Sequence, residues 1–214
     1  MMAEQLSFFD NDTAPRPPAS EPPRRKPKPH ILFFAILPPH ETAIEITERR
    51  QVLCGELGLR GTPVAPDRLH ITLHPLGSYD ALPENLVAAA CKAAASVAAA
   101  PFDICFDRVI TFKSNAQKKP VTLLPDNEIQ PLMELERRLV AALAAAGLKV
   151  RPTPKFTPHI TLAYSEEFSG QQAVDPVRWR VNEFALIHSH YGKTRHDLLG
   201  RWPLLGRLAH AMDS

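Results

Sequence analysis

The sequence lacks several features that would assign a compartment or a cofactor at once. It has three cysteines, Cys54, Cys91 and Cys105, at scattered positions and without a CxxC pair. An odd, scattered set argues against a disulfide framework or a cysteine zinc site and is typical of a reducing compartment. No apolar run approaches the length of a membrane span, and the acidic first residues do not form a secretory signal. We therefore expect a cytoplasmic protein without a membrane partner.

The sequence also lacks a strong net charge and the common metal or nucleotide motifs. The formal charge is +2 over 214 residues, so any attraction to phosphate must come from a local arrangement of groups. A Walker loop and an HExxH string are absent from the sequence. We expect no metal and no other cofactor. Hydrophobic residues make up 44% of the chain, which is enough for one domain or two small lobes.

Proline usage separates the start of the chain from the rest. Seven prolines crowd residues 1–29, which contain few large apolar residues. Such a segment cannot bury enough surface to offset its ordering entropy, so we expect a disordered tail. Its basic end is interpreted as a solvated linker rather than an RNA-tethering arm. We expect one folded domain over residues 30–208, a short tail over 209–214, and a monomer.

Hydrophobic periodicity predicts an α+β fold. Helices are expected over residues 41–57, 82–99 and 128–146. Strands are expected over residues 31–37, 64–76, 102–112, 121–124, 159–162, 177–191 and 195–202, with 177–191 as one long strand. The order of these elements favours two α+β lobes that face each other across a cleft.

Two four-residue strings repeat each other 89 positions apart: His70-Ile71-Thr72-Leu73 and His159-Ile160-Thr161-Leu162. In an extended strand, side chains two residues apart point to the same face. Each string therefore presents one imidazole and one hydroxyl together, while the isoleucine and leucine point toward a core. Two such strands side by side would form a pocket with two imidazoles and two hydroxyls.

Such a pocket is suited to acid–base chemistry on a phosphate. Opening a 2′,3′-cyclic phosphate requires a nucleophile to lose a proton and a ribose oxygen to gain one. Histidine, with an ordinary pKa of about 6.5, can do either near neutral pH. Two histidines on opposite sides of the phosphorus can do both, and the threonine hydroxyls can hold the non-bridging oxygens. A lone histidine in an apolar strand is more often a core residue, so the prediction depends on the matched pair.

The two strings, with residues 32–36, 68–73, 156–162 and 199–204, resemble the 2H phosphoesterase superfamily. They are most similar to its RNA 2′,3′-cyclic phosphodiesterase branch, also called the 2′-5′ RNA ligase family, over about residues 30–206. The resemblance implies a bilobal fold with two pseudo-symmetric lobes of antiparallel sheet, flanking helices and a central cleft. It also implies hydrolysis of RNA 2′,3′-cyclic phosphate ends to a 2′-phosphate, and reversible 2′-5′ joining of RNA ends without ATP.

The same resemblance implies roles for individual residues. By the family pattern, His70 and His159 carry the proton transfers, and Thr72 and Thr161 bind the phosphate. We expect His70 to protonate the leaving 3′-oxygen and His159 to activate water. RNA ends or small cyclic nucleotides are the expected substrates.

The chain departs from the family pattern after each string. Tyr164 stands where many relatives have an arginine, and Pro75 stands where many have an aromatic residue. Tyr164 is expected to offer the substrate a hydroxyl or a stacking surface. Two alternatives follow: an RNA- or nucleotide-binding module with little turnover, or a phosphodiesterase for another small cyclic phosphate or a 2′-5′ oligonucleotide.

Three further histidines lie at strand spacing. His74, four residues after His70, is expected to line the cleft without binding a metal. His188 and His190 share a strand face, and we expect them to form a surface pair on an edge strand.

Overall fold

The computed structural model describes residues 29–56, 60–111, 118–150, 156–166 and 170–205. Of the predicted tails, 1–29 and 209–214, the structure describes only Pro29, whose carbonyl accepts a hydrogen bond from the Tyr191 amide.

Strands and helices follow the predicted order with two exceptions discussed below. The strands are β1 (His30–Ile36), β2 (Gly61–Pro63), β3 (Ile71–Tyr79), β4 (Phe102–Thr111), β5 (Lys119–Leu124), β6 (Ile160–Ser165), β7 (Gln171–Val181), β8 (Glu183–His190) and β9 (Arg195–Pro203). The helices are α1 (His40–Glu56), α2 (Glu84–Ala95) and α3 (Gln130–Ala145). A 3₁₀ turn over Pro66–Arg68 precedes β3.

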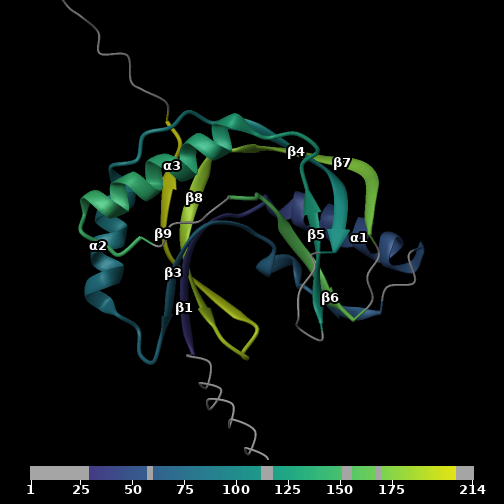
Figure 1. Cartoon of the computed structure of the whole chain (residues 1–214), viewed down its shortest axis with the longest axis horizontal. Helices are drawn as coiled ribbons and strands as arrows, with labels where there is room; N and C mark the ends of the chain where they lie inside the picture. The colour runs from purple at the N-terminus through teal and green to yellow at the C-terminus, as the bar shows by residue number, and fades with distance from the viewer. Residues whose placement is uncertain (1–28, 57–59, 112–117, 151–155, 167–169, 206–214) are drawn as a thin grey trace, which may run out of the picture.

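One antiparallel sheet divides into two lobes. Its strands follow the order β7-β4-β5-β6-β3-β1-β8-β9, and β2 also pairs with β6. The first lobe contains β1, β3, β8 and β9, and the second contains β2 and β4 to β7 (Figure 1). Strands β3 and β6 join the lobes through a single register pair, Ile71 with Ile160. The predicted bilobal α+β fold with antiparallel sheet and flanking helices is confirmed.

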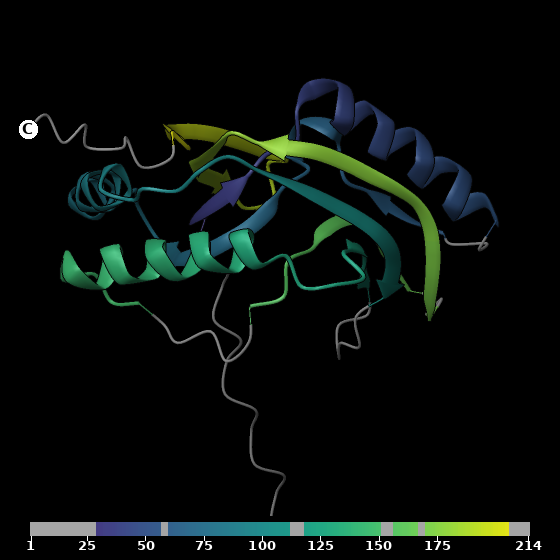
Figure 2. The same cartoon turned by 90° about the horizontal axis from the view of Figure 1, so that it is seen from above.

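Helices α1 and α3 pack crosswise, away from the lobe of the strand that precedes each of them. Helix α1 follows β1 of the first lobe in the chain, yet it packs against β7 of the second lobe (Figures 1 and 2). Helix α3 follows β5 of the second lobe, yet it packs against β3 and α2 on the first lobe. The buried face of α3 repeats at helical spacing, because its fully buried leucines are Leu132, Leu135, Leu139 and Leu143. Helix α3 therefore covers the lobe opposite to the two strands that flank it, and α1 crosses from β1 of the first lobe to the second lobe.

The predicted strand over 177–191 is wrong: it is two strands that end and begin on either side of Asn182. Strand β7 pairs with β4 in the second lobe, whereas β8 pairs with β1 in the first lobe. The backbone carbonyl of Asn182 accepts a hydrogen bond from the Leu204 amide at 2.7 Å. No glycine or proline marks this crossing, so the continuous strand pattern hides a change of partner.

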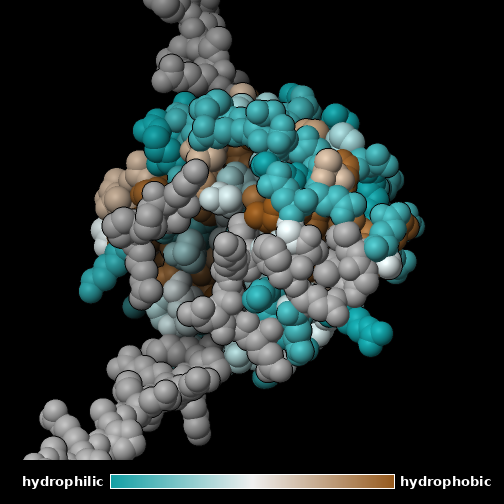
Figure 3. Space-filling view, turned by 45° about the vertical axis from the view of Figure 1, so that its right-hand side comes forward, coloured by the Kyte–Doolittle hydropathy of each residue, from teal (hydrophilic) through white to brown (hydrophobic). Residues whose placement is uncertain are grey.

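The second exception concerns residues 64–76, for which the sequence predicts one strand. Strand β3 begins only at Ile71, and the shorter β2 ends at Pro63 on the other lobe. Among the described helices, none combines the length and apolar composition needed to cross a membrane. The three cysteines are free thiols. On the face seen in Figure 3, hydrophilic residues cover the upper and right-hand edges, and hydrophobic residues show near the middle and at the left.

Candidate active site

The two repeated strings meet at the junction of the lobes. Ile71 and Ile160 are antiparallel partners, and each is 0% exposed. Because neighbouring residues in a strand point to opposite faces, the histidine and threonine that flank each isoleucine point away from this core. The structure therefore brings both strings to one place, as the spacing predicts.

The register also determines how the four polar side chains are arranged. Continuing the antiparallel register by one residue in each direction sets His70 beside Thr161 and His159 beside Thr72. All four residues are partly buried. The two histidines are diagonal neighbours across the pair, a relation that separates residues by about 7–8 Å. This spacing leaves room for a phosphate between the two rings.

Both histidines are held in the same way. Each lies directly before its strand rather than within it. The Nδ1 of His70 donates to the carbonyl oxygen of Arg68 at 2.7 Å, and the Nδ1 of His159 donates to that of Thr157 at 2.8 Å. A carbonyl oxygen can only accept, so both rings carry a hydrogen on Nδ1. In the neutral ring, Nε2 is then the nitrogen that can take up a proton.

A matching bulge follows in each strand. The register between β1 and β3 skips Leu73, and the register between β5 and β6 skips Leu162. The leucine and the residue after it, His74 or Ala163, are all buried. A bulge places two residues opposite one and so reverses the alternation beyond it. The structural similarity of the two strands therefore extends beyond the four matching residues of each string.

The bulges determine where Pro75 and Tyr164 lie. These residues occupy equivalent positions in the two strands, and both are exposed. Tyr164 exposes 45% of its surface, and the bulge returns it to the same face as Thr161. The structure thus places Tyr164 on the strand face that carries the polar residues.

His74 does not line the cleft, and that prediction is wrong. It is 1% exposed, lies opposite Phe34, and is turned toward the helix-covered core by the bulge at Leu73. Its Nδ1 has no hydrogen-bond partner among the described residues. Burial lowers the pKa of His74, so the ring is neutral near neutral pH.

His70 lies in a half-enclosed aromatic environment. The Phe33 ring centroid is 4.8 Å from that of His70, and the His196 ring centroid is 5.5 Å away. Burial lowers the pKa of His70 most, and the nearby charges of His159 and Arg68 lower it further. The hydrogen bond to the Arg68 carbonyl opposes this shift. The coupling between His70 and His159 indicates that imidazoles from different lobes influence each other.

Sequence reasoning missed three residues around His70: Phe33, Arg68 and His196. The Nη2 of Arg68 is 3.5 Å from the Nε2 of His196. Burial, together with the charges of His70 and Arg68, lowers the pKa of His196 to about 4, so this ring is neutral and can accept from the guanidinium. Arg68 lies within a string already singled out. No pattern in the sequence marks His196, because only the pairing of β9 with β8 brings it near His70.

Several solved structures are similar to this chain. E. coli LigT complexed with 3′-AMP shares 27% identity with a TM-score of 0.65, and the match covers 83% of this chain and 99% of LigT. The protein TT0787 of Thermus thermophilus shares 26% identity over the same proportions, with a TM-score of 0.61. A crystal structure described as a phosphoesterase shares 28% identity over these proportions, with a TM-score of 0.62. None of the curated proteins compared with the chain matches it.

A family model described as the 2′-5′ RNA ligase superfamily matches residues 37–193. This range is more than half of the chain and includes both strings and the junction between the lobes. It agrees with the fold shared with LigT and with the resemblance seen in the sequence. The chain therefore belongs to the 2′-5′ RNA ligase superfamily, the group of 2H phosphoesterases.

Proposed function

We propose that this protein hydrolyses 2′,3′-cyclic phosphates at RNA ends and leaves a 2′-phosphate and a free 3′-hydroxyl. Membership of the superfamily supports a phosphoesterase activity. The observation that carries the narrower proposal is the pair His70 and His159. They come from different lobes, share one face of the β3–β6 junction, and are oriented by equivalent hydrogen bonds.

The proposed reaction needs one neutral and one protonated imidazole. Neutral His159 takes a proton from water as the water oxygen bonds to phosphorus. The bond from phosphorus to the 3′-oxygen breaks, and protonated His70 gives its proton to that oxygen. Burial lowers the pKa of His70, whereas a phosphate anion bound between the rings favours the imidazolium form. Substrate binding therefore supplies the charge that the acid requires.

Neutral and cationic donors would hold the phosphate during this step. Thr72 and Thr161 are the cross-strand neighbours of His159 and His70, so their hydroxyls can donate to the non-bridging oxygens. Arg68 adds a positive charge near His70, and its Nε is buried without a hydrogen-bond partner among the described residues. This guanidinium would supply the charge that an arginine at the position of Tyr164 would otherwise give.

The same arrangement supports the joining of RNA ends. If an RNA 5′-hydroxyl replaces water as the nucleophile, His159 takes its proton, His70 protonates the leaving 3′-oxygen, and a 2′-5′ bond forms without ATP. In the reverse cleavage of that bond, the two histidines exchange roles. The relative LigT has been crystallised with 3′-AMP, which supports a nucleotide phosphate as the ligand of this cleft. Tyr164, exposed on the same strand face, would contact the adjoining base or sugar.

The experiment is hydrolysis of a 2′,3′-cyclic nucleotide in the presence of EDTA, with chromatography of the product. We expect the 2′-monophosphate, and each of His70→Ala and His159→Ala should lower kcat/KM by about 10²–10⁴-fold. His40→Ala is the matched control, since His40 is exposed at the start of α1. Absence of product, or full activity in either active-site variant, would overturn the proposal. Binding without turnover would favour the binding module instead.

The division of labour between the histidines has its own test. In a substrate with sulfur in place of the 3′-oxygen, the leaving thiolate needs no proton. Such a substrate should restore the rate of His70→Ala toward the wild-type value and leave His159→Ala impaired. Restoration of His159→Ala instead would reverse the assignment of acid and base.

A further inference from the structure

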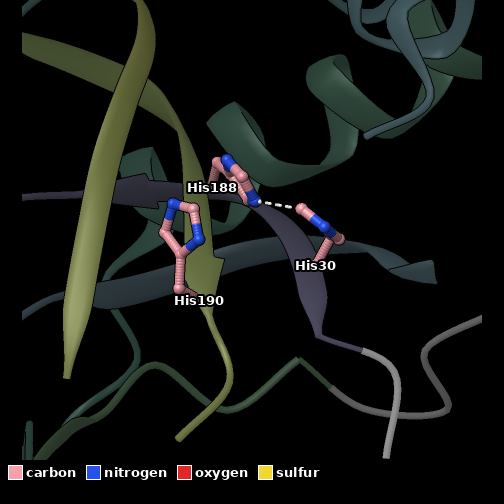
Figure 4. A group of neighbouring side chains, drawn as sticks. All are labelled: His30, His188 and His190. Atoms are coloured by element: carbon pink, nitrogen blue, oxygen red, sulfur yellow. Dashed lines mark hydrogen bonds between the residues drawn. The ribbon is translucent and has the colours of Figure 1, made fainter. Parts of the chain in front are cut away.

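Three histidines gather at one end of the first lobe, away from the proposed phosphate site. His30 begins β1, and His188 and His190 end β8, which pairs with β1 (Figure 4). The Nδ1 of His30 is 2.9 Å from the Nε2 of His188. One ring nitrogen from each of the three residues lies within 4.8 Å of the others. Strand β8 lies between β1 and β9, so the prediction of an edge-strand surface pair is wrong.

This cluster and the proposed phosphate site occupy opposite faces of the sheet. His188 and His190 alternate with Ile187, which packs beside Phe33, the neighbour of His70. They share a face with Leu186, which belongs to the main core under the helices. A ligand held by this cluster is therefore separated by the sheet from a phosphate bound at His70.

Neighbouring side chains hold the histidine cluster in an orientation suited to metal binding. The Nε2 of His190 is 2.7 Å from the Oδ2 of Asp197, which fixes the ring and turns its other nitrogen toward His188 and His30 (Figure 4). Arg195 donates to both oxygens of Asp197, at 2.7 and 3.1 Å. A carboxylate behind a ligating imidazole is typical of metal sites in proteins, where it orients the ring and raises its basicity.

The buried His188 suits a cation ligand. His188 is 4% exposed, and its pKa is lowered mainly by burial and then by the neighbouring His190 and His30. A neutral imidazole is the form that ligates a metal. Of the charged groups that face the cluster, Asp197 offsets Arg195 through their ion pair.

We propose that His30, His188 and His190 bind a divalent transition-metal ion, with Zn²⁺ as the best-matched ion. Three imidazole nitrogens without a thiolate suit zinc, which accepts three protein ligands and a water in tetrahedral geometry. At zinc–nitrogen distances of about 2.0–2.1 Å, tetrahedral ligand atoms lie about 3.3 Å apart. A small movement of the His30 and His188 rings from their present 2.9 Å separation would admit the ion.

This proposal departs from the expectation that the chain binds no metal. That expectation rested on missing cysteine pairs and motifs, whereas this ligand set joins residues 158 positions apart. The bound ion would connect the first residue of β1 to the end of β8, and we assign it no part in phosphate chemistry. Proposed hydrolysis and metal binding are therefore independent, and either can fail without the other.

The experiment is a calorimetric titration of the untagged full-length protein with Zn²⁺ near neutral pH, with Mg²⁺ as the comparison ion. We expect one Zn²⁺ per chain and no binding of Mg²⁺, which prefers oxygen ligands. His30→Gln and His190→Gln should each lower the affinity at least about 10-fold, and Asp197→Asn should lower it by about 10–100-fold. His40→Gln, on α1, should leave it unchanged.

A thermal melt gives an independent measurement. Zn²⁺ should raise the Tm of the wild-type protein and of His40→Gln, and at the same concentration it should raise the Tm of His190→Gln by clearly less. Lowering the pH below about 6 should release the ion, because the imidazoles become protonated. Absence of Zn²⁺ binding to the wild-type protein would overturn the proposal whatever the variants do. Equal affinity in the wild type and in all cluster variants would also overturn it.

Discussion

Ile71 and Ile160 face each other across the lobe junction, and neither side chain is exposed. They are the one described register pair between β3 and β6, and the proposed catalytic histidine precedes each of them. Stability and site geometry therefore depend on the same contact.

Shortening either isoleucine should destabilise the whole protein. Ile71→Ala or Ile160→Ala should lower the free energy of unfolding in urea by about 2–5 kcal/mol, because each leaves a cavity in the core. Ile44→Ala is the matched control, since Ile44 is 37% exposed on α1, and it should change stability by less than about 0.5 kcal/mol. Equal effects at all three positions would contradict the central role of this pair.

Thr72 and Thr161 should contribute to kcat/KM to a similar extent. Thr72→Val and Thr161→Val keep the side-chain shape and strand preference but remove the hydroxyl. Loss of a hydrogen bond to a charged group costs about 1.5–3 kcal/mol, so each variant should lower kcat/KM by about 10–150-fold. Steady-state kinetics on a 2′,3′-cyclic nucleotide would measure this. A strongly unequal loss of kcat/KM in the two variants would show that the two threonines do not contact the phosphate equivalently.

The pH profile of kcat/KM should be bell-shaped, because one ring must be neutral and the other protonated. His70 is the proposed acid and must be protonated, so the loss of its proton should determine the alkaline limb, and burial lowers the pKa of His70. Phe33→Leu lets water reach the ring and raises the pKa of His70, which should move the alkaline limb to higher pH. Phe184→Leu, a core change on the other face of β8, should leave the limb in place. An unmoved limb in Phe33→Leu would contradict this explanation.

His196 should make the fold sensitive to acid. Its pKa is about 4 in the folded protein against 6.5 ordinarily. As the pH falls from 6.5 to 4, the unfolded chain therefore binds a proton that the folded protein does not, and stability falls by at most about 3 kcal/mol. His196→Gln should remove this contribution. Urea unfolding at a series of pH values would show a shallower loss in the variant, and an unchanged slope would refute the assignment.

Arg68 should bind the substrate anion. Arg68→Gln should raise KM more than it lowers kcat and should reduce kcat/KM by about 10-fold or more, since the lost contact is charge-assisted. Arg137→Gln removes a cation from the exposed face of α3 and should have no effect. If both variants have the same KM and kcat/KM as the wild type, Arg68 does not bind the substrate anion.

Local patterns in the sequence predict most of the elements. The leucines of α3 repeat at helical spacing, and a short apolar run marks β1. The paired strings also predict which histidines and threonines meet, because period-two alternation determines the face of each side chain. The family model and the similar structures confirm the superfamily that these strings suggest.

What the sequence does not reveal depends on pairing between distant strands. The bulge at Leu73 turns His74 into the core, and no local signal marks it. The crossing at Asn182 separates two strands that read as one, because each side has a different partner. His196 and His30 join their clusters only through the positions of β9 and β1 in the sheet.

The crosswise packing of α1 and α3 has a consequence for how the molecule folds. Helices α1 and α3 each pack on the lobe opposite to the strand that precedes them, and β8 and β9 return to the first lobe at the end of the chain. A fragment that ends between β3 and β4 would therefore contain neither lobe complete. Despite its two-part appearance, the protein should unfold in a single cooperative transition. Separately expressed halves should remain unfolded alone and recover structure only when mixed.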